Sequence, residues 1–532
     1  MARISVPESS QDGRLLSVRQ SIMAMLGLCF VTMLVAVDQT VVGTALPTIV
    51  AELNGFELYA WVATSYLLTS IIMVPIFGRL GDYYGRKPFV VASILLFTLA
   101  SMLCGMAESM LQLVWARALQ GIGGGMLVGT AWACVPDLFP DSRVRLRWQV
   151  LLSASFGVAN AIGPTLGGVL TQYAGWRSVF YVNVPIGLLS LLFIWLFFPY
   201  LRPARCAPIR LDWQGAVLLA LGLGSLQVFV ELVPFYGASL LMVMLGLLGV
   251  AVFVGLYFWE KRCKEPLLPM EMFHNKSLVA LFWLSLFSGI ILFALLFYVP
   301  LLLQGGFGLT PQQTGFLITP LVVFITVGSI TNGRIVTRVS NPNVMLYAGF
   351  FLLLGAFVGV VTSHRGTTQW HFAAYMALAG TGLGFVMPNL TVFAQEIAGR
   401  ALLGITTAML QSVRMIGGML GTAVVGTLVT HYYVDGVRAS MPLGEPQPWT
   451  PLLEDPQVLV NALVQNNFLQ RLQHMDLDGA AFIEVARLSL VSAIHSGLLV
   501  TAVIILIALF WVTRVPPIVL AGAVNTGPDK DE

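Results

Sequence analysis

Charged residues are scarce in this chain of 532 residues. Asp, Glu, Lys and Arg together make up 10% of the sequence, whereas hydrophobic residues make up 57%. A soluble globular protein carries about 25% charged residues, so the composition excludes a soluble protein. One membrane helix takes roughly 20 apolar residues, so we expect on the order of a dozen spans. The net charge of +3 is small and dispersed, which argues against a nucleic-acid partner.

Cysteine and histidine are also rare, with five and six residues. The cysteines lie in apolar segments or in predicted cytoplasmic loops, so we expect no disulfide bonds. No Cys-x-x-Cys pair or Cys/His cluster is present, and we expect no metal and no cofactor. The histidines form none of the Ser/His or His/Asp arrangements that a catalytic site would need, which argues against a polytopic membrane enzyme.

Windows of about 20 apolar residues predict an all-α integral membrane protein with fourteen spans in a 6 + 2 + 6 arrangement. The first span is interpreted as uncleaved rather than as a signal peptide, because Asp38 interrupts it and another span follows at once. The spans lie near 22–46, 58–77, 89–107, 112–134, 146–170, 177–198, 213–231, 239–258, 277–303, 312–336, 343–361, 370–394, 403–429 and 489–512.

These windows predict the domain organisation. The expected parts are an N-terminal segment 1–21, a six-helix bundle 22–198, a two-helix insertion with its flanking loops 199–276, a six-helix bundle 277–512 that includes a long loop 431–488, and a tail 513–532.

The basic residues predict the orientation. With a cytoplasmic N-terminus, 21 of the 28 Lys and Arg residues fall in cytoplasmic segments and five fall outside. Because cytoplasmic loops carry an excess of Lys and Arg, we expect both termini in the cytoplasm. The loop 431–488 is then external, and it is either a hairpin or lid that touches a partner or a tolerated surface loop.

The two six-span halves share a weak repeat. The loop GRLGDYYGRKP at 78–88 is echoed by GRIVTRVSNP at 333–342, and RALQGIGGG at 117–125 is echoed by MALAGTGLG at 376–384. The glycines recur and the charges do not. Parallel repeats of this kind are typical of transporters that rock around a site near the membrane midplane.

Three ionisable residues lie deep in predicted spans, where charge is expensive and therefore indicates function. Asp38 is a candidate proton carrier, or it pairs with a polar neighbour. Arg117 either stabilises the deprotonated form of Asp38 or joins helices by hydrogen bonds. Arg414 stands at the head of a Gly-rich face and is more often a structural residue.

Two further segments are candidates for function. The loop at 78–88 combines turn glycines with an acid and several bases, and it is expected to form a contact that breaks when the halves rock. Its candidate residues are Gly78, Arg79, Gly81, Asp82, Gly85, Arg86 and Lys87. In span 5, a proline that bends the helix lies among small residues that permit close approach, although generic packing would use them too. These residues are Gly157, Gly163, Pro164, Gly167 and Gly168.

These motifs together resemble the major facilitator superfamily, and within it the fourteen-span drug:proton antiporters. The resemblance rests on DQTVVGTALP at 38–47, the loop at 78–88, the run at 117–125 and GPTLGG at 163–168. GWR at 175–177 and NVPIG at 183–187 are also similar to that branch, and the likeness runs from the first span to the last.

The resemblance implies proton-driven multidrug efflux of lipophilic, often cationic compounds by alternating access, across the inner (plasma) membrane. Carried over by position, it makes Asp38 the acid of proton coupling, Arg117 its partner, Asp82 with Arg79 and Arg86 the cytoplasmic gate, and the bent span 5 the antiporter helix. Its partners would be small amphiphilic substrates, protons and the lipid bilayer, with a periplasmic adaptor as one further partner.

Two departures from the family pattern bear on the substrate. Relatives that handle dications often carry acids in spans 10 and 13, which have none here at midplane, and Gly43 stands where the family usually has Asn. We therefore expect monocations or neutral amphiphiles rather than dications. The alternatives are a dedicated exporter of one physiological metabolite, a polytopic membrane enzyme, or a channel.

Overall fold

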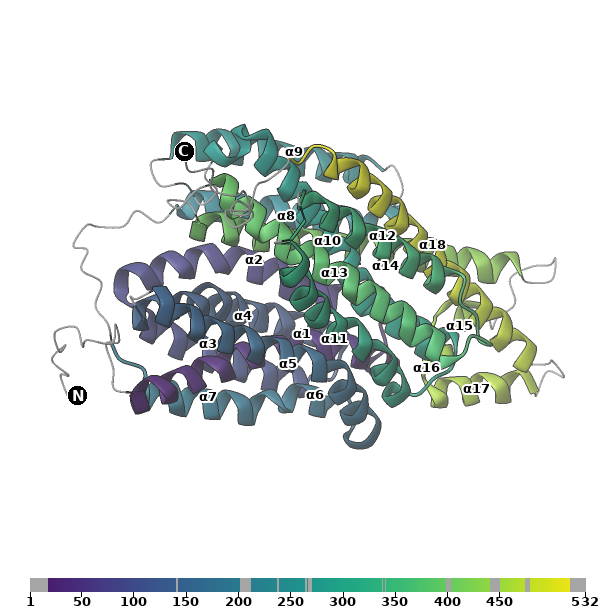
Figure 1. The fold of residues 1–532 in the computed structure, drawn as a ribbon. Coiled ribbons are helices and arrows are strands. Elements are labelled where there is room, and N and C mark those ends of the chain that lie inside the picture. The colour runs from purple at the N-terminus through teal and green to yellow at the C-terminus, as the bar shows by residue number, and fades with distance from the viewer. Residues whose placement is uncertain are drawn as a thin grey trace, which may run out of the picture.

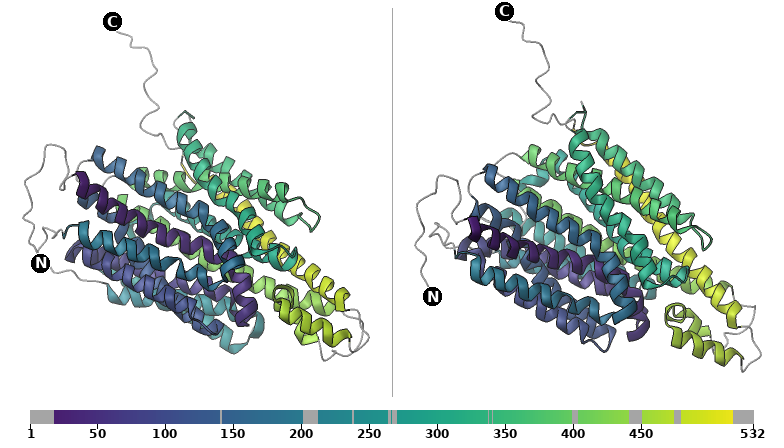
Figure 2. Two further views of the ribbon diagram at one scale, coloured as in Figure 1. Left: turned by 90° about the horizontal axis from the view of Figure 1, so that it is seen from below. Right: turned by 60° about the horizontal axis from the view of Figure 1, so that its bottom comes forward.

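The computed structural model describes residues 18–139, 142–200, 212–236, 239–263, 266, 270–336, 338–339, 341–398, 403–440, 450–473 and 479–516. Nearly all of these residues are helical, and the helices form two adjacent halves (Figure 2). The first half holds α1 (Val18–Leu53), α2 (Tyr59–Tyr84), α3 (Arg86–Gly105), α4 (Met110–Leu138), α5 (Ser142–Ala174), α6 (Arg177–Tyr181) and α7 (Asn183–Phe197). The expected span at 177–198 is thus divided at Val182.

The second half follows an inserted helix pair. The pair is α8 (Trp213–Tyr236) and α9 (Leu240–Arg262), of which α8 contacts α2 and α14 while α9 lies outside it (Figure 1). The second half holds α10 (Lys276–Leu301), α11 (Pro311–Val336), α12 (Asn343–Val361), α13 (Gln369–Ala398), α14 (Leu403–Ala439) and α18 (Gly479–Val512). Short turns of helix are η1 (Phe56–Leu58), η2 (Met270–His274) and the π turn η3 (Leu302–Gly306).

The long loop after α14 contains three short helices. These are α15 (Thr450–Glu454), α16 (Gln457–Val460) and α17 (Ala462–Gln473), and we call residues 450–473 the helical cap. Helix α14 runs to Ala439, and α18 already begins at Gly479, so both helices extend beyond the expected spans into the loop predicted at 431–488. We call the side of the bundle that holds the cap the cap end, and the side where α1 begins and α18 finishes the terminal end (Figure 2).

Twelve of the described helical segments are long and apolar enough to cross a membrane. Their outer faces expose large apolar side chains, for example Leu247 and Val250 on α9, whose exposed fractions are 64% and 63%. Such a surface suits lipid rather than water. The chain is therefore a multi-pass membrane protein. Helices α4 and α5, which occupy the fourth and fifth expected spans, are not among the twelve, but parts of both lie outside the described side chains, so this number does not test them.

The echoed glycines of the two halves make equivalent contacts. In the first half, a Cβ added to Gly125 of α4 would lie 2.5 Å from the Ser70 carbonyl of α2. At the matching place in the second half, a Cβ on Gly384 of α13 would lie 2.5 Å from the Ile325 carbonyl of α11. Small residues of this kind let helix backbones touch inside a membrane. The weak sequence repeat thus corresponds to a repeated way of packing helices.

The hydrogen bonds between the two halves, among described residues, lie in the part of the bundle nearer the cap end. The Gln304 amide of η3 donates to the Thr44 carbonyl of α1 at 2.8 Å, and the Tyr59 hydroxyl of α2 donates to the Phe297 carbonyl of α10 at 2.7 Å. The Thr165 hydroxyl of α5 lies 2.6 Å from that of Thr319 on α11. The halves are therefore closed against each other on this side.

The helical cap bridges the two halves. It is held to the second half by the Tyr433 hydroxyl, which donates to the Leu453 carbonyl at 2.7 Å, and by Arg438, which forms two hydrogen bonds with Glu454 at 2.6 and 3.1 Å. It reaches the first half through Asn461, whose amide donates to the Ala51 carbonyl at 2.5 Å near the end of α1. Movement of the halves at the cap end must break or stretch this last bond.

We predict that Asn461→Ala loosens the cap. The substitution removes the bond to Ala51 and the bond that the Val464 N–H donates to Asn461 Oδ1, and a hydrogen bond of this kind contributes about 1 kcal/mol. Hydrogen exchange of residues 457–473 should therefore rise by at least roughly fivefold, as expected for the loss of one such bond. The exposed Asn467 provides the matched control, and Asn467→Ala should leave exchange unchanged. Equal exchange in both variants would show that Asn461 does not hold the cap.

The docking of the cap should also depend on pH. Burial raises the pKa of Asp455, the carboxylate of Glu57 raises it further, and the backbone N–H of Gln457 opposes them. Because the docked state binds the Asp455 proton more tightly, this stabilisation is present in acid and is lost as pH rises through the raised pKa. We therefore expect exchange of the wild-type cap to increase, as pH rises above the usual pKa range of an aspartate, more than in Asp455→Asn, after correction for intrinsic rates. Parallel pH profiles would contradict this.

Candidate functional site

Asp38 lies on α1 in the interior of the first half, where only 1% of it is exposed. Its carboxylate accepts three hydrogen bonds. Arg117 donates to Oδ2 at 2.7 Å, while Gln120 and Asn183 donate to Oδ1 at 2.7 and 3.1 Å. A buried charge is tolerated only when it is paired and hydrogen-bonded, and these donors satisfy that requirement.

Arg117 projects from α4 and is 2% exposed. Besides the ion pair with Asp38, its Nε donates to the Val62 carbonyl of α2 at 3.2 Å, and its Nη1 donates to Gln120 at 2.7 Å. Its guanidinium lies 4.4 Å from the centre of the Tyr66 ring, which provides a cation–π contact. The two ionisable residues that the sequence predicts in the first half are thus in direct contact.

Amide and hydroxyl groups extend this cluster to α3 and α7. The Asn183 amide also donates to the Ser101 hydroxyl at 2.9 Å, and Ser101 donates to the Phe180 carbonyl at 2.9 Å. Sequence reasoning did not assign roles to Gln120, Asn183 or Tyr66. The available signal for Gln120 was its position three residues after Arg117, which places both on one face of a helix.

The cluster joins four helices through one buried ion pair. Removing one partner of a buried ion pair costs about 3–5 kcal/mol, because the other charge stays buried without compensation. A proton on Asp38 has this effect, since it neutralises the carboxylate and leaves the Arg117 guanidinium unpaired. Arg117 must then find other partners, and α1, α2, α4 and α7 meet at this point.

The small residues of α5 form two distinct contact faces. One face packs on α1, where Gly163 meets the Thr40 side chain and a Cβ on Gly167 would lie 2.6 Å from the Val41 carbonyl. The other face packs on α11 of the second half, where Gly168 meets the Pro311 carbonyl and the Pro164 carbonyl meets Gly315.

Gly157 continues the second face, since its added Cβ would lie 3.4 Å from the Thr326 hydroxyl of α11. The predicted antiporter helix therefore packs closely on both halves.

The predicted gate loop joins α2 to α3. Gly85 has a positive φ of 86°, which ends α2 before Arg86 starts α3. A Cβ on Gly81 would lie 3.6 Å from the Thr130 side chain of α4, and one on Gly78 would lie 3.6 Å from the Gly129 carbonyl.

The side chain of Lys87 forms hydrogen bonds at the end of α7. Its Nζ donates to the Trp195 and Phe198 carbonyls at 2.9 and 2.5 Å. The side chains of Arg79 and Asp82 lie outside the described part of the structure, so their predicted ion pair stays a prediction.

Arg414 lies on α14, apart from the cluster on Asp38. Its side chain is half-buried, and its Nε is buried without a hydrogen-bond partner. Within the described residues, no hydrogen bond or ion pair joins Arg414 to another group. Its backbone is held tightly, because Gly289 of α10 packs against the Arg414 carbonyl.

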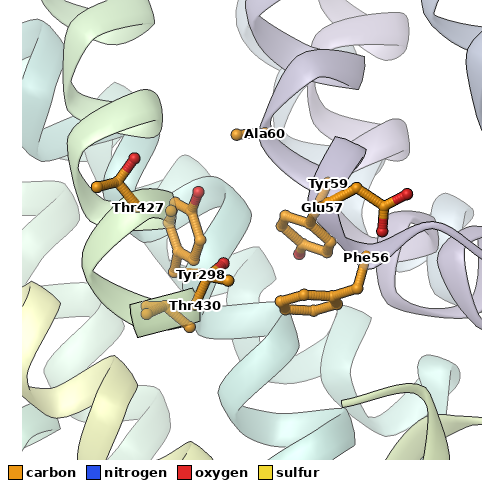
Figure 3. A pocket seen from close by; sticks show the side chains of 9 residues that line it. Phe56, Glu57, Tyr59, Ala60, Tyr298, Thr427 and Thr430 are labelled. Carbon is orange, nitrogen blue, oxygen red and sulfur yellow. The ribbon is translucent and has the colours of Figure 1, made fainter. Parts of the chain in front are cut away.

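A small void separates the halves near the cap end (Figure 3). Phe56, Glu57 and Tyr59 lie on one side of it, and Tyr298 and Thr427 lie on the other. Its volume of about 20 Å³ accommodates about one water molecule. It is therefore a packing gap in the closed side rather than a site for a drug-sized molecule.

Comparison with known proteins identifies the family. Residues 28–422 match the Major Facilitator Superfamily. The chain is 34% identical over 412 residues to multidrug transporter protein MdtP of Bacillus subtilis, covering 76% of this chain and 74% of that protein. It is 31% identical over 444 residues to multidrug resistance protein 3 of the same organism, covering 80% of this chain and 85% of that protein.

Solved structures agree on the fold. A bacterial homolog of the human lysosomal transporter Spinster, crystallised in an inward-facing and occupied conformation, superposes with a TM-score of 0.66 at 15% identity over 94% of this chain and 97% of that chain. A peptide transporter, POT, crystallised with sulfate, superposes with a TM-score of 0.60 at 13% identity over 93% of this chain and 96% of that chain. Family match, curated relatives and fold agree, and the chain therefore belongs to the Major Facilitator Superfamily of membrane transporters and is not an enzyme.

Proposed function

We propose that this chain exports lipophilic small molecules from the cytoplasm in exchange for protons. The observation that carries the proposal is the buried contact of Asp38 with Arg117, Gln120 and Asn183. Its relatives of about one-third identity are named as a multidrug transporter and a multidrug resistance protein, which supports efflux.

The proton step uses the cluster on Asp38. In the deprotonated state, the carboxylate holds Arg117 from α4 and Asn183 from α7. A proton on Asp38 removes the charge that holds Arg117, so the protonated state favours a different arrangement of these helices. Proton binding then shifts the equilibrium between the two orientations of the transporter, because it acts differently on each.

The transport step uses the contacts between the halves. On the cap end, α5 meets α11, α2 meets α10, and η3 meets α1. In alternating access, these contacts separate when the path opens on that side. The gate loop at 78–88 is proposed to perform the corresponding task at the terminal end, with Asp82 pairing with Arg79 or Arg86.

We propose that α4 and α5 also cross the membrane, which gives fourteen spans. In support, α4 packs along α2 and α3, and α5 packs along α1 and α11, so both lie within the bundle. The distribution of Lys and Arg supports a cytoplasmic terminal end, with the cap outside the inner membrane. The cap is then the surface that a periplasmic adaptor would meet. The resemblance adds monocations and neutral amphiphiles as the expected substrates.

We predict that Asp38→Asn uncouples transport from protons. Asparagine cannot be charged and so cannot replace the proposed proton carrier Asp38. The rate of export driven by a pH gradient should fall at least about tenfold, as is usual when a proton-transfer group is removed. The measurement is proton release from everted vesicles on addition of a panel of lipophilic compounds, beside substrate counterflow, which needs no gradient.

Glu52→Gln is the matched control, because Glu52 is an acid on the same helix but pairs with Arg177 near the cap end. This variant should retain coupling. If Asp38→Asn releases protons as the wild type does, Asp38 lies outside the coupling path. If no compound in the panel releases protons through the wild type, export of one physiological metabolite becomes the better proposal.

We predict that Gly168→Ala opens the cap end. The added methyl meets the Pro311 carbonyl across the two halves, and overpacking of this kind costs about 1–3 kcal/mol. The population open at the cap end should rise by about tenfold, since 1.4 kcal/mol corresponds to that factor. Distances between spin labels on the cap ends of α5 and α11 report the change.

Gly167→Ala is the comparison for this prediction, because its methyl meets Val41 and Thr44 within the first half. It should affect the stability of the first half and leave the distance distribution between α5 and α11 unchanged. Identical distributions for Gly168→Ala and the wild type would contradict the role of this contact in closing the cap end.

A further inference from the structure

We infer that Arg414 binds an acidic group of the transported molecule, so that the substrates include lipophilic carboxylic acids. This inference rests on the proposed export of lipophilic compounds, and it adds acids to the cations and neutral amphiphiles expected from the resemblance. The sequence had favoured a structural role for Arg414, and the contacts of this residue lead to a different assignment.

The charges in the two halves are balanced differently. In the first half, Asp38 and Arg117 form a closed ion pair, whose carboxylate is 1% exposed and accepts three hydrogen bonds. A cationic substrate therefore finds no vacant carboxylate at Asp38. In the second half, Arg414 has no carboxylate partner in the part of the chain that the structure describes.

Arg414 lies on α14 between the terminal end and the contacts that close the cap end. Helix α14 begins at the terminal end, and Cα–Cβ bonds tilt toward the start of a helix, so the side chain extends toward that end. The contacts that close the halves lie at the cap end, beyond Arg414. The residue as a whole is half-buried while its Nε is buried, and ionisable residues inside membrane bundles face the interior or a water-filled path.

The backbone of Arg414 is fixed in position. Gly289 packs against its carbonyl, and Gly417, one turn further along α14, packs against the Leu286 carbonyl of α10. A guanidinium held on a rigid helix pair is suited to a planar oxyanion, because it offers two parallel N–H donors.

The test compares three probes that differ only in their polar group: 2-naphthylacetate, 2-naphthylacetamide and 2-naphthylethylamine. Binding to the full-length protein in nanodiscs is measured by tryptophan quenching and corrected with empty nanodiscs. At pH 7, the wild type should bind the acid at least tenfold more tightly than the amide, and the amine most weakly. Equal affinity for acid and amide, or preference for the amine, would overturn the inference.

Two variants then assign the effect to Arg414. Arg414→Gln should weaken binding of the acid at least tenfold and leave binding of the amide within twofold, so that the amide also reports a folded protein. The affinity of Arg414→Lys for the acid should lie between those of the wild type and Arg414→Gln, because an ammonium keeps the charge but loses the paired donors. Arg365 forms an exposed ion pair with Glu484, and Arg365→Gln should bind all three probes with the affinities of the wild type. An equal loss for all three probes in Arg414→Gln, or no loss for the acid, would contradict the inference.

This binding experiment needs no pH gradient, so its outcome is separate from that of the proton-release measurement. Acid selectivity with no proton release would uphold the role of Arg414 and remove the proposed coupling. Proton release on addition of lipophilic cations, together with no acid selectivity, would uphold antiport and remove the role of Arg414.

Discussion

Close approach of helix backbones at small residues is the constraint on which this structure depends. Lipid gives helices no hydrophobic reason to associate, so van der Waals contact and hydrogen bonds must hold them. Gly125 on α4 and Gly384 on α13 meet carbonyls of α2 and α11 in the same way, and Gly167 and Gly168 let α5 touch α1 and α11. Because α4 lies so close to α2, Arg117 can donate to the Val62 carbonyl while it pairs with Asp38.

In the proposed proton step, the same environment makes loss of the Asp38–Arg117 ion pair costly. Each charge is tolerated in the interior only through the other, and the surrounding amides of Gln120 and Asn183 come from α4 and α7. A proton on Asp38 therefore changes the balance of forces between several helices at once. In water, a comparable ion pair would be screened and replaced by solvent at little cost, and its protonation would leave the helices where they are.

Much of the fold and part of the site could be predicted from the sequence. Apolar windows predicted the long helices, and Asp38 and Arg117 were identified because charge is expensive in lipid. Gln120 and Asn183 were missed, since amides in apolar helices carry no comparable signal. The glycines of α5 predicted close packing, but their division between α1 and α11 depends on how the helices are arranged in space. Helices α1 and α14 extend beyond their apolar windows because helical hydrogen bonding continues outside the apolar core.

The two halves share helix packing but differ in their polar groups. Arg117 of α4 corresponds in the repeat to Met376 of α13, so the second half has no counterpart of the ion pair at that position. Instead, α11 and α13 are joined by the neutral amides of Asn332 and Asn389, which exchange hydrogen bonds of 3.1 and 2.8 Å. This link carries no charge and does not respond to protons at neutral pH. The two proposals therefore fall in different halves: Asp38 in the first half is the proposed site of proton coupling, and Arg414 in the second half is the proposed site for the acidic group of the transported molecule.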